Sequence, residues 1–139
     1  MHITDEMIYR FAPFAETLGI TFPELKAHRV QAYLPVKNEF TTLGGGLHGG
    51  AIMSICDVAS AVCVALNIDD GKVWSTAESN SYFLRPVRHA ATATATPIKL
   101  GKALTTVKTE VHDHTGTLCA YTTQIIYLTQ ATGTHSLRP

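Results

Sequence analysis

The segment that most constrains the fold of this chain is residues 49–66, which are apolar on almost every side of a helix. Within it, one stripe of apolar side chains recurs at helical spacing. The stripe consists of Ile52, Ile55, Ala59, Val62 and Leu66. A helix that is apolar nearly all round has to be buried on most of its sides. The sequence therefore predicts one long central helix, closed by the turn-forming residues 67–71 (NIDDG).

Strands are predicted before and after this helix. Across residues 28–36, apolar side chains alternate with more polar ones, which is the pattern of a strand with one buried face. The other predicted strands are residues 20–25, 75–84, 90–100, 103–113 and 117–128. Residues 4–18 predict a short amphipathic helix with a kink at Pro13. We expect an α+β fold in which a curved antiparallel sheet wraps around the central helix.

Length and charge narrow the class of protein. The 139 residues suit one domain over 1–139, with 130–139 as a flexible polar tail. With 11 Lys and Arg against 11 Asp and Glu, no basic field favours nucleic acid or an anionic membrane. The longest apolar stretch, 51–66, is too short for a membrane span and contains an acid. Three cysteines without C-x-x-C spacing favour free thiols in a cytoplasmic protein.

Asp57 is the one charged side chain in the central helix. Burying an unpaired carboxylate is costly, so Asp57 has to be paired, hydrated or partly protonated. In one interpretation it lies on the single exposed strip of the helix and is held by a neighbouring backbone group. In the other it faces a pocket with a raised pKa and acts as a base or nucleophile.

A glycine-rich run, residues 44–50 (GGGLHGG), directly precedes the helix. Glycines let the backbone approach a ligand closely, and the first N–H groups of a helix can hold an anion or an oxyanion. The alternatives are a tight turn into the helix, or a dinucleotide site, because residues 44–49 fit G-x-G-x-x-G. The dinucleotide site is disfavoured, since the segments that follow read as antiparallel strands and not as a βαβ unit.

Gly49 and Asp57 are eight residues apart on the predicted helix. At 1.5 Å per residue they are separated by about 12 Å along its axis, too far to touch one small reacting group. If both act on one carbonyl, they have to come from two chains. An antiparallel pair of helices about a two-fold axis meets this requirement, so the hypothesis predicts a homodimer with two equivalent sites at its interface.

Four motifs in the chain resemble those of one known family. They are GLHGGA at 46–51 with Asp57 nine residues after His48, NSYFLRP at 80–86, GKAL at 101–104 and DHTGTLCA at 113–120. On these motifs the chain resembles the hotdog-fold acyl-CoA thioesterases of the phenylacetate-pathway type, over roughly residues 28–128. The resemblance implies hydrolysis of an acyl-CoA thioester by a homodimer or a dimer of dimers, with no cofactor and no metal.

The resemblance also implies roles for individual residues. Asp57 would be the general base or nucleophile, the Gly49 N–H of the other chain would polarise the carbonyl, and His48 would shape the loop. Thr76 falls where the family often places a hydroxyl beside the attacking water. Thr42 occupies the position, six residues before His48, where the family usually has Asn.

Further residues are expected to contact the substrate. Besides Thr42, they are Gly50, Arg85, Arg88 and Lys102, the last three through the CoA phosphates. Two other functions stay open at this point. The same fold could bind acyl-CoA or a similar small ligand without turnover, or the glycine loop could serve a nucleotide-binding regulator.

Overall fold

The computed structural model describes residues 2–132. In it the central helix α3 runs from Gly49 to Ala65, with His48 as its N-cap residue and Leu66 as its C-cap. The predicted apolar stripe is buried except at its end, where Leu66 is half-buried; Ile55 and Ala59 have no exposed surface. Full burial of a side chain such as Ile55 contributes about 1.5–3 kcal/mol to stability. The helix is therefore held in place chiefly by its own apolar surface.

Six antiparallel strands form one sheet within the described residues, in the order β1-β2-β4-β5-β6-β3. The strands are β1 (Thr21–Lys26), β2 (Arg29–Pro35), β3 (Lys72–Phe83), β4 (Ala90–Leu100), β5 (Leu104–His112) and β6 (Leu118–Gln130). Strand β3 does not pair with β4, its successor in the chain, but with β6. This crossover makes β3 one edge of the sheet and β1 the other.

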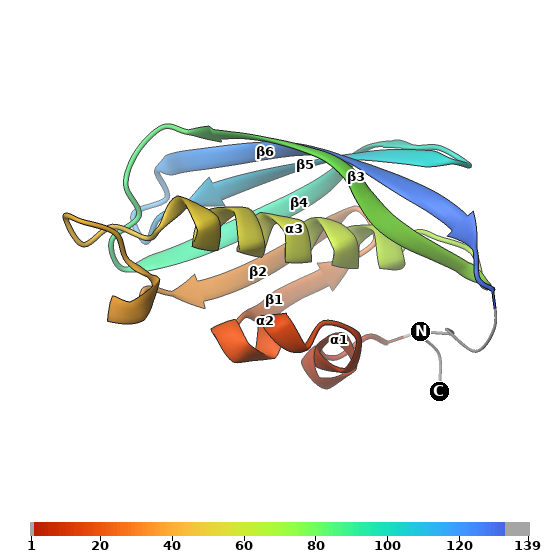
Figure 1. Cartoon of the computed structure of the whole chain (residues 1–139), viewed down its shortest axis with the longest axis horizontal. Helices are drawn as coiled ribbons and strands as arrows, with labels where there is room; N and C mark the ends of the chain where they lie inside the picture. The colour runs from red at the N-terminus through yellow and green to blue at the C-terminus, as the bar shows by residue number, and fades with distance from the viewer. Residues whose placement is uncertain (1, 133–139) are drawn as a thin grey trace.

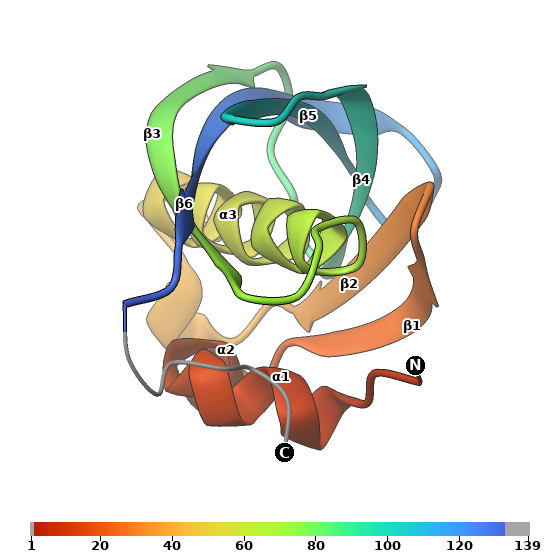
Figure 2. The ribbon, with the colours of Figure 1, turned by 90° about the vertical axis from the view of Figure 1, so that its right-hand side faces the viewer.

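The sheet curves around α3, as Figures 1 and 2 show. Small side chains face the helix from β4, where Ala91, Ala93 and Ala95 have no exposed surface. They alternate with half-buried threonines, which is the predicted period-2 pattern. The N-terminal helices α1 and α2 lie on the side of α3 that the sheet leaves open (Figure 2). The predicted α+β arrangement, a curved antiparallel sheet around one long helix, is confirmed.

The prediction of one helix over residues 4–18 is wrong. The segment forms two helices, α1 (Asp5–Phe11) and α2 (Pro13–Leu18). Between them Ala12 leaves the helical region, with φ −133° and ψ 69°. Proline disfavours the α conformation in the residue before it and has no N–H to donate, so Pro13 starts a new helix instead of bending the first.

Several boundaries also differ from the predicted ones. Strand β3 begins at Lys72 instead of Ser75, and β6 continues to Gln130, which was expected to belong to the tail. Residues 133–139 of that predicted tail lie outside the described part. The loop after β2 contains the one-turn 3-10 helix η1 (Asn38–Phe40). Over residues 2–132, no helix combines the length and apolar character that crossing a membrane would require.

Candidate active site

The N-terminus of α3 is built by His48 and the two glycines that follow it. The His48 Nδ1 atom accepts a hydrogen bond of 2.8 Å from the Gly50 N–H. This contact requires an unprotonated Nδ1, so the neutral imidazole carries its proton on Nε2. Gly49, the first helical residue, has no acceptor for its N–H within the described chain. One amide at the positive end of the helix dipole is therefore free to donate.

The glycine loop before the helix is a closed turn. Thr42 and Gly46 are joined by a backbone hydrogen bond of 2.9 Å. Gly44 and Gly45 have φ of 94° and 82°, the left-handed region that side chains with a Cβ disfavour. Arg88 donates to the Gly44 carbonyl at 2.6 Å. This bond ties the loop to the segment that follows β3.

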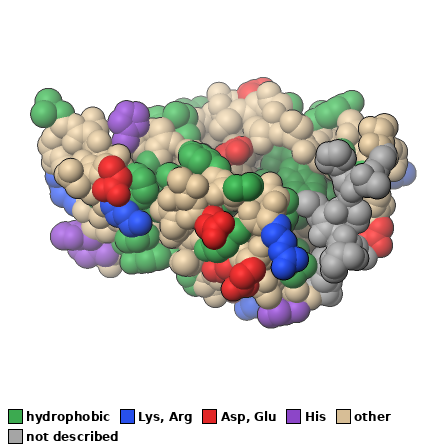
Figure 3. Space-filling view, turned by 60° about the horizontal axis from the view of Figure 1, so that its bottom comes forward, with side chains coloured by type: hydrophobic (Ala, Val, Ile, Leu, Met, Phe, Trp, Pro, Cys, Tyr) green, Lys and Arg blue, Asp and Glu red, His purple; other side chains and the backbone are tan. Residues whose placement is uncertain are grey.

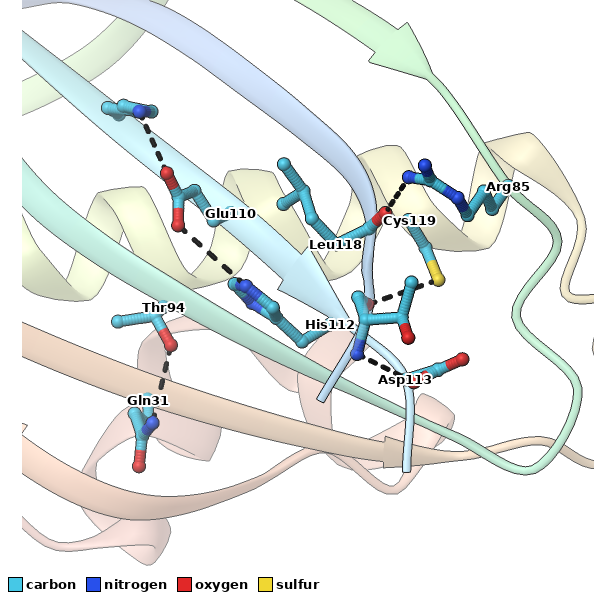
Figure 4. A network of polar contacts seen from close by, with 10 residues as sticks. Gln31, Arg85, Thr94, Glu110, His112, Asp113, Leu118 and Cys119 are labelled. Atoms are coloured by element: carbon cyan, nitrogen blue, oxygen red, sulfur yellow. Dashed lines mark hydrogen bonds and ion pairs between the residues drawn. The ribbon is translucent and has the colours of Figure 1, made fainter. Parts of the chain in front are cut away.

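A groove of about 400 Å³ lies where this loop, the start of α3 and the end of β3 meet. Of the residues predicted to act on the substrate, it brings together Thr42, Gly49, Arg85 and Arg88. Arg85 is oriented by a hydrogen bond of 2.9 Å to the Leu118 carbonyl (Figure 4). We call this hollow the loop groove. It places two cationic side chains beside the free amide of Gly49.

Asp57 lies in the middle of α3 and is held by side chains from two strands. Thr76 of β3 donates to the Asp57 Oδ1 atom at 2.9 Å, and Gln124 of β6 donates to the same oxygen at 3.0 Å. The other oxygen, Oδ2, has no partner among residues 2–132. Asp57 is exposed in the single chain. It thus occupies the exposed strip of the helix, but side chains and not a backbone group hold it.

The exposed strip of α3 faces away from most of the sheet and runs beside β3. It contains Met53, 46% exposed, and the half-buried Ser54, Ala61 and Ala65. Together with Asp57, these residues form what we call the open face. A view toward the underside of the molecule shows hydrophobic side chains gathered around a hollow (Figure 3). The single chain therefore leaves apolar surface around Asp57, the one acid of α3, exposed to solvent.

The loop groove and Asp57 are separate places in one chain, and two other predicted residues join neither of them. Because α3 is continuous from Gly49 to Ala65, Gly49 and Asp57 stay about 12 Å apart along the axis in one chain. The Gly50 N–H is already bonded to His48 and is not free. Lys102 lies near the opposite end of α3, beside a smaller hollow of about 200 Å³ that Lys72 also lines.

Two residues near Asp57 complete the description of the site. Cys56 has no exposed surface, and burial raises the pKa of its thiol to about 11. It is therefore a thiol at neutral pH and unsuited to act as a nucleophile. Gln124 was not identified as a site residue from the sequence. A signal existed, because Gln124 is polar but occupies one of the alternate positions of the strand over 117–128 that are expected to face the core.

Groups of three or more His, Cys, Asp or Glu side chains that could hold a metal ion are absent from residues 2–132. The polar groups at the site are thus a carboxylate, hydroxyls, an amide and a free backbone N–H. They can hold a water molecule or a carbonyl group and move a proton.

Comparison with known proteins identifies thioesterases and esterases as similar to this chain. A family model described as "Thioesterase superfamily" matches residues 44–120. A protein of Saccharolobus solfataricus named "Putative esterase" is 33% identical over 104 residues, 74% of this chain and 74% of the relative. One of Haemophilus influenzae with the same name is 29% identical over 103 residues, 73% of this chain and 75% of that one.

Solved structures show the same fold. The crystal structure of a thioesterase from Haemophilus influenzae has a TM-score of 0.88 at 24% identity, covering 97% of this chain and 96% of that one. A phenylacetic acid degradation-related protein from Ralstonia eutropha has a TM-score of 0.77 at 24% identity, covering 83% of this chain and 89% of that one. These likenesses and the family match confirm the hotdog fold expected from the sequence motifs.

Proposed function

Because the chain belongs to the thioesterase superfamily, we propose that it hydrolyses the thioester of an acyl-CoA to the free acid and CoA. Family membership supports hydrolysis of thioesters in general. One observation carries the finer proposal. The Asp57 carboxylate has Oδ1 held by Thr76 and Gln124, while Oδ2 has no hydrogen-bond partner among residues 2–132.

In the proposed reaction, Asp57 acts on the thioester carbonyl with its Oδ2 atom. As a general base, Oδ2 takes a proton from a water molecule whose oxygen attacks the carbonyl carbon. As a nucleophile, Oδ2 itself bonds to that carbon, and water then hydrolyses the resulting anhydride. In either route the carbon–sulfur bond breaks, the acid is released, and the sulfur leaves as the CoA thiolate, which takes up a proton.

The carbonyl oxygen gains negative charge in this reaction and needs a donor. We assign that role to the Gly49 N–H, which has no acceptor in the described part of the chain and lies at the positive end of α3. Since Gly49 and Asp57 of one chain are about 12 Å apart, the donor comes from a second copy. His48 shapes the donor by accepting from Gly50 at 2.8 Å.

A second copy has a place to bind. The outer edge of β3 pairs with no strand within the described residues, and the open face lies beside it. A long unpaired edge and exposed apolar surface are features that proteins usually cover. Two antiparallel copies of α3 packed through their open faces would bring Gly49 of each near Asp57 of the other. The site would then exist only in a dimer or a dimer of dimers.

The loop groove and the face around Asp57 suggest how the substrate lies. Arg85 and Arg88 would contact CoA phosphates at the loop groove, with Lys102 as a further cation at the other end of α3. Trp74 pairs with Leu128 on the helix-facing side of β3, two residues from Thr76, and packs edge-on against Phe11. We propose that the acyl group contacts Trp74.

Release of free thiol from a series of acyl-CoA substrates tests the activity. Wild-type protein should release thiol, and Asp57→Asn should be at least about 100-fold slower, because it removes the base or nucleophile without changing the side chain's size. Equal rates for the two proteins would refute the role of Asp57. Binding measured by calorimetry with no thiol released would instead favour a protein that holds acyl-CoA without turnover.

A mixing experiment tests the two-chain site. Asp57→Asn and Gly49→Pro should each be nearly inactive alone. If the site is shared, a mixed dimer has one intact site, with Asp57 from one chain and the Gly49 N–H from the other. Random reassortment after unfolding and refolding together should restore about a quarter of wild-type activity. No restoration would show that the two groups act within one chain.

A further inference from the structure

Gln124 is a polar residue in a place where the sheet otherwise presents small, apolar or hydroxyl side chains to α3. Its side chain is 1% exposed. The Nε2 atom donates to the Asp57 Oδ1 atom at 3.0 Å and to the Ser79 Oγ atom at 3.3 Å. The Oε1 atom is buried and has no hydrogen-bond partner among the described residues. Both hydrogen-bond donors of the Gln124 amide nitrogen are therefore used, whereas its carbonyl oxygen accepts no hydrogen bond from the described residues.

A buried carbonyl oxygen without a partner lowers the stability of the fold. Such groups are rare in proteins, and each one needs an explanation. Methionine has nearly the same shape and would fill this position without an orphaned oxygen. The interior around Gln124 supports that alternative, because Ile126 and Ala120 on the same face of β6 are apolar and buried. The benefit of Gln124 thus has to come from its amide nitrogen.

We propose that Gln124 is a positioning residue for the hydrolysis assigned to Asp57. With Thr76 it occupies the Oδ1 atom from two directions, which fixes the rotation of the carboxylate and leaves Oδ2 as the reacting oxygen. This role rests on the proposed function, because it acts only through Asp57.

The side chains that surround Asp57 on the neighbouring strands carry no charge. On β3, the residues paired with the helix-facing side of β6 are all uncharged: Trp74, Thr76, Ser79, Ser81 and Phe83. Those of β6, from Ala120 to Leu128, are uncharged as well. The thiol of Cys56, adjacent on α3, has a pKa of about 11. Among these residues, Asp57 is therefore the one acid that the Gln124 amide contacts.

Gln124→Met is the decisive variant. It should lower kcat by about 10- to 100-fold with little change in KM, because a misplaced base affects the chemical step more than binding. The Tm should stay the same or rise, since the orphaned oxygen is removed together with the donor.

Thr109→Val is the matched control. Thr109 and Ser60 have no exposed surface and bond to each other at 2.8 Å, and neither of them bonds to Asp57. This variant should lower Tm and leave kcat unchanged. If Gln124→Met behaved in the same way, Gln124 would be merely structural and the inference would be overturned.

Gln124→Glu keeps the test valid if methionine prevents folding. Two neighbouring carboxyl groups share one proton, so at low pH the protonated carboxyl group of this variant donates to Asp57 in place of the amide. We expect activity to persist there and to fall as the pair loses its proton, which adds an alkaline limb. A profile like that of the wild type would overturn the inference. If Asp57→Asn were fully active, the proposed function itself would fail, which separates the two failures.

Discussion

Thr76 and Asp57 are joined by a hydrogen bond of 2.9 Å in which the hydroxyl donates and the Oδ1 atom accepts. An ionised carboxylate has only acceptors, so the direction of this bond is fixed. The proton of Thr76 is therefore committed to Asp57, and only its lone pairs remain for a water molecule. The family resemblance implies that Thr76 lies beside the attacking water. That role stays a prediction, and the structure adds a contact with the acid.

Removing this hydroxyl should weaken catalysis through Asp57. Thr76→Val keeps the shape of the side chain but loses the donor that orients Asp57, so we expect kcat/KM to fall about tenfold. Thr76→Ser keeps the hydroxyl and should stay within about threefold of wild type. Equal losses in the two variants, measured by thiol release across pH 4–9, would show that the methyl group and not the hydroxyl matters.

The Gly49 amide can be deleted without disturbing the helix. Gly49 is the first helical residue, where proline is well tolerated, and His48 before it has φ −59° and ψ 140°, values that suit a residue preceding proline. Gly49→Pro should lower kcat by about 100- to 1000-fold, the usual cost of losing one oxyanion donor.

Gly49→Ala is the control for that variant, because it keeps the N–H. A Cβ at this position would meet the Phe83 ring at 3.4 Å, an ordinary contact. We expect Gly49→Ala to retain most activity and both variants to show the same helical circular dichroism. Equal activity of the proline and alanine variants would exclude this amide as the donor.

Thiol reagents should leave the enzyme active at neutral pH. Burial raises the pKa of Cys56 to about 11, so the reactive thiolate is scarce in the folded protein. A thiol that ionises near pH 8.5 when unfolded and only near 11 when folded loses stabilising power as pH rises between these values. Tm should fall over that range, and less steeply in Cys56→Ala. Rapid loss of activity with iodoacetamide at pH 7 would contradict this account.

Arg85 should matter for the CoA part of the substrate only. Arg85→Gln should raise KM for an acyl-CoA about five- to tenfold, because it removes a cation at the loop groove. KM for the same acyl group on N-acetylcysteamine, which has no phosphates, should not change. A matching rise for both substrates would indicate that Arg85 instead holds the Leu118 carbonyl and thereby the shape of the groove.

Acid stability should depend on the hairpin turn between β5 and β6. Hydrogen bonds from the Thr115 hydroxyl and from the backbone of Thr115 and Thr117 hold the pKa of Asp113 below its usual range. A lowered pKa contributes stability above the unfolded value, near 3.9, that is lost as pH falls toward the folded value. Tm measured from pH 5 to pH 2 should therefore fall less in Asp113→Asn than in wild type.

The main elements could be predicted because local patterns determine them. The apolar stripe of residues 49–66 produces α3, and alternation in β2 and β4 produces strands with one buried face. The break at Ala12 was underestimated, because a proline is compatible both with a kink and with a new helix start. The pairing of β3 with β6 depends on long-range contacts, which no periodicity encodes.

The site was only partly predictable for the same reason. Asp57 stands out as a charge among apolar residues, and Gly49 follows from the glycine run. The hydrogen bond from Gln124 arises because β6 and α3, 67 residues apart at this contact, pack against each other. A bulge between Thr76 and Glu78 shifts the register of β3 at the residue that contacts Asp57, and strand propensity gives no sign of it.

The uncovered edge of β3 has a consequence for how activity would depend on dilution. If two copies must meet before an acid and its amide face each other, a lone chain is inert, and turnover per subunit declines once the concentration drops below the dissociation constant. The equilibrium between single chains and dimers would then set a threshold, because newly made chains would stay inactive until their concentration is high enough for them to associate.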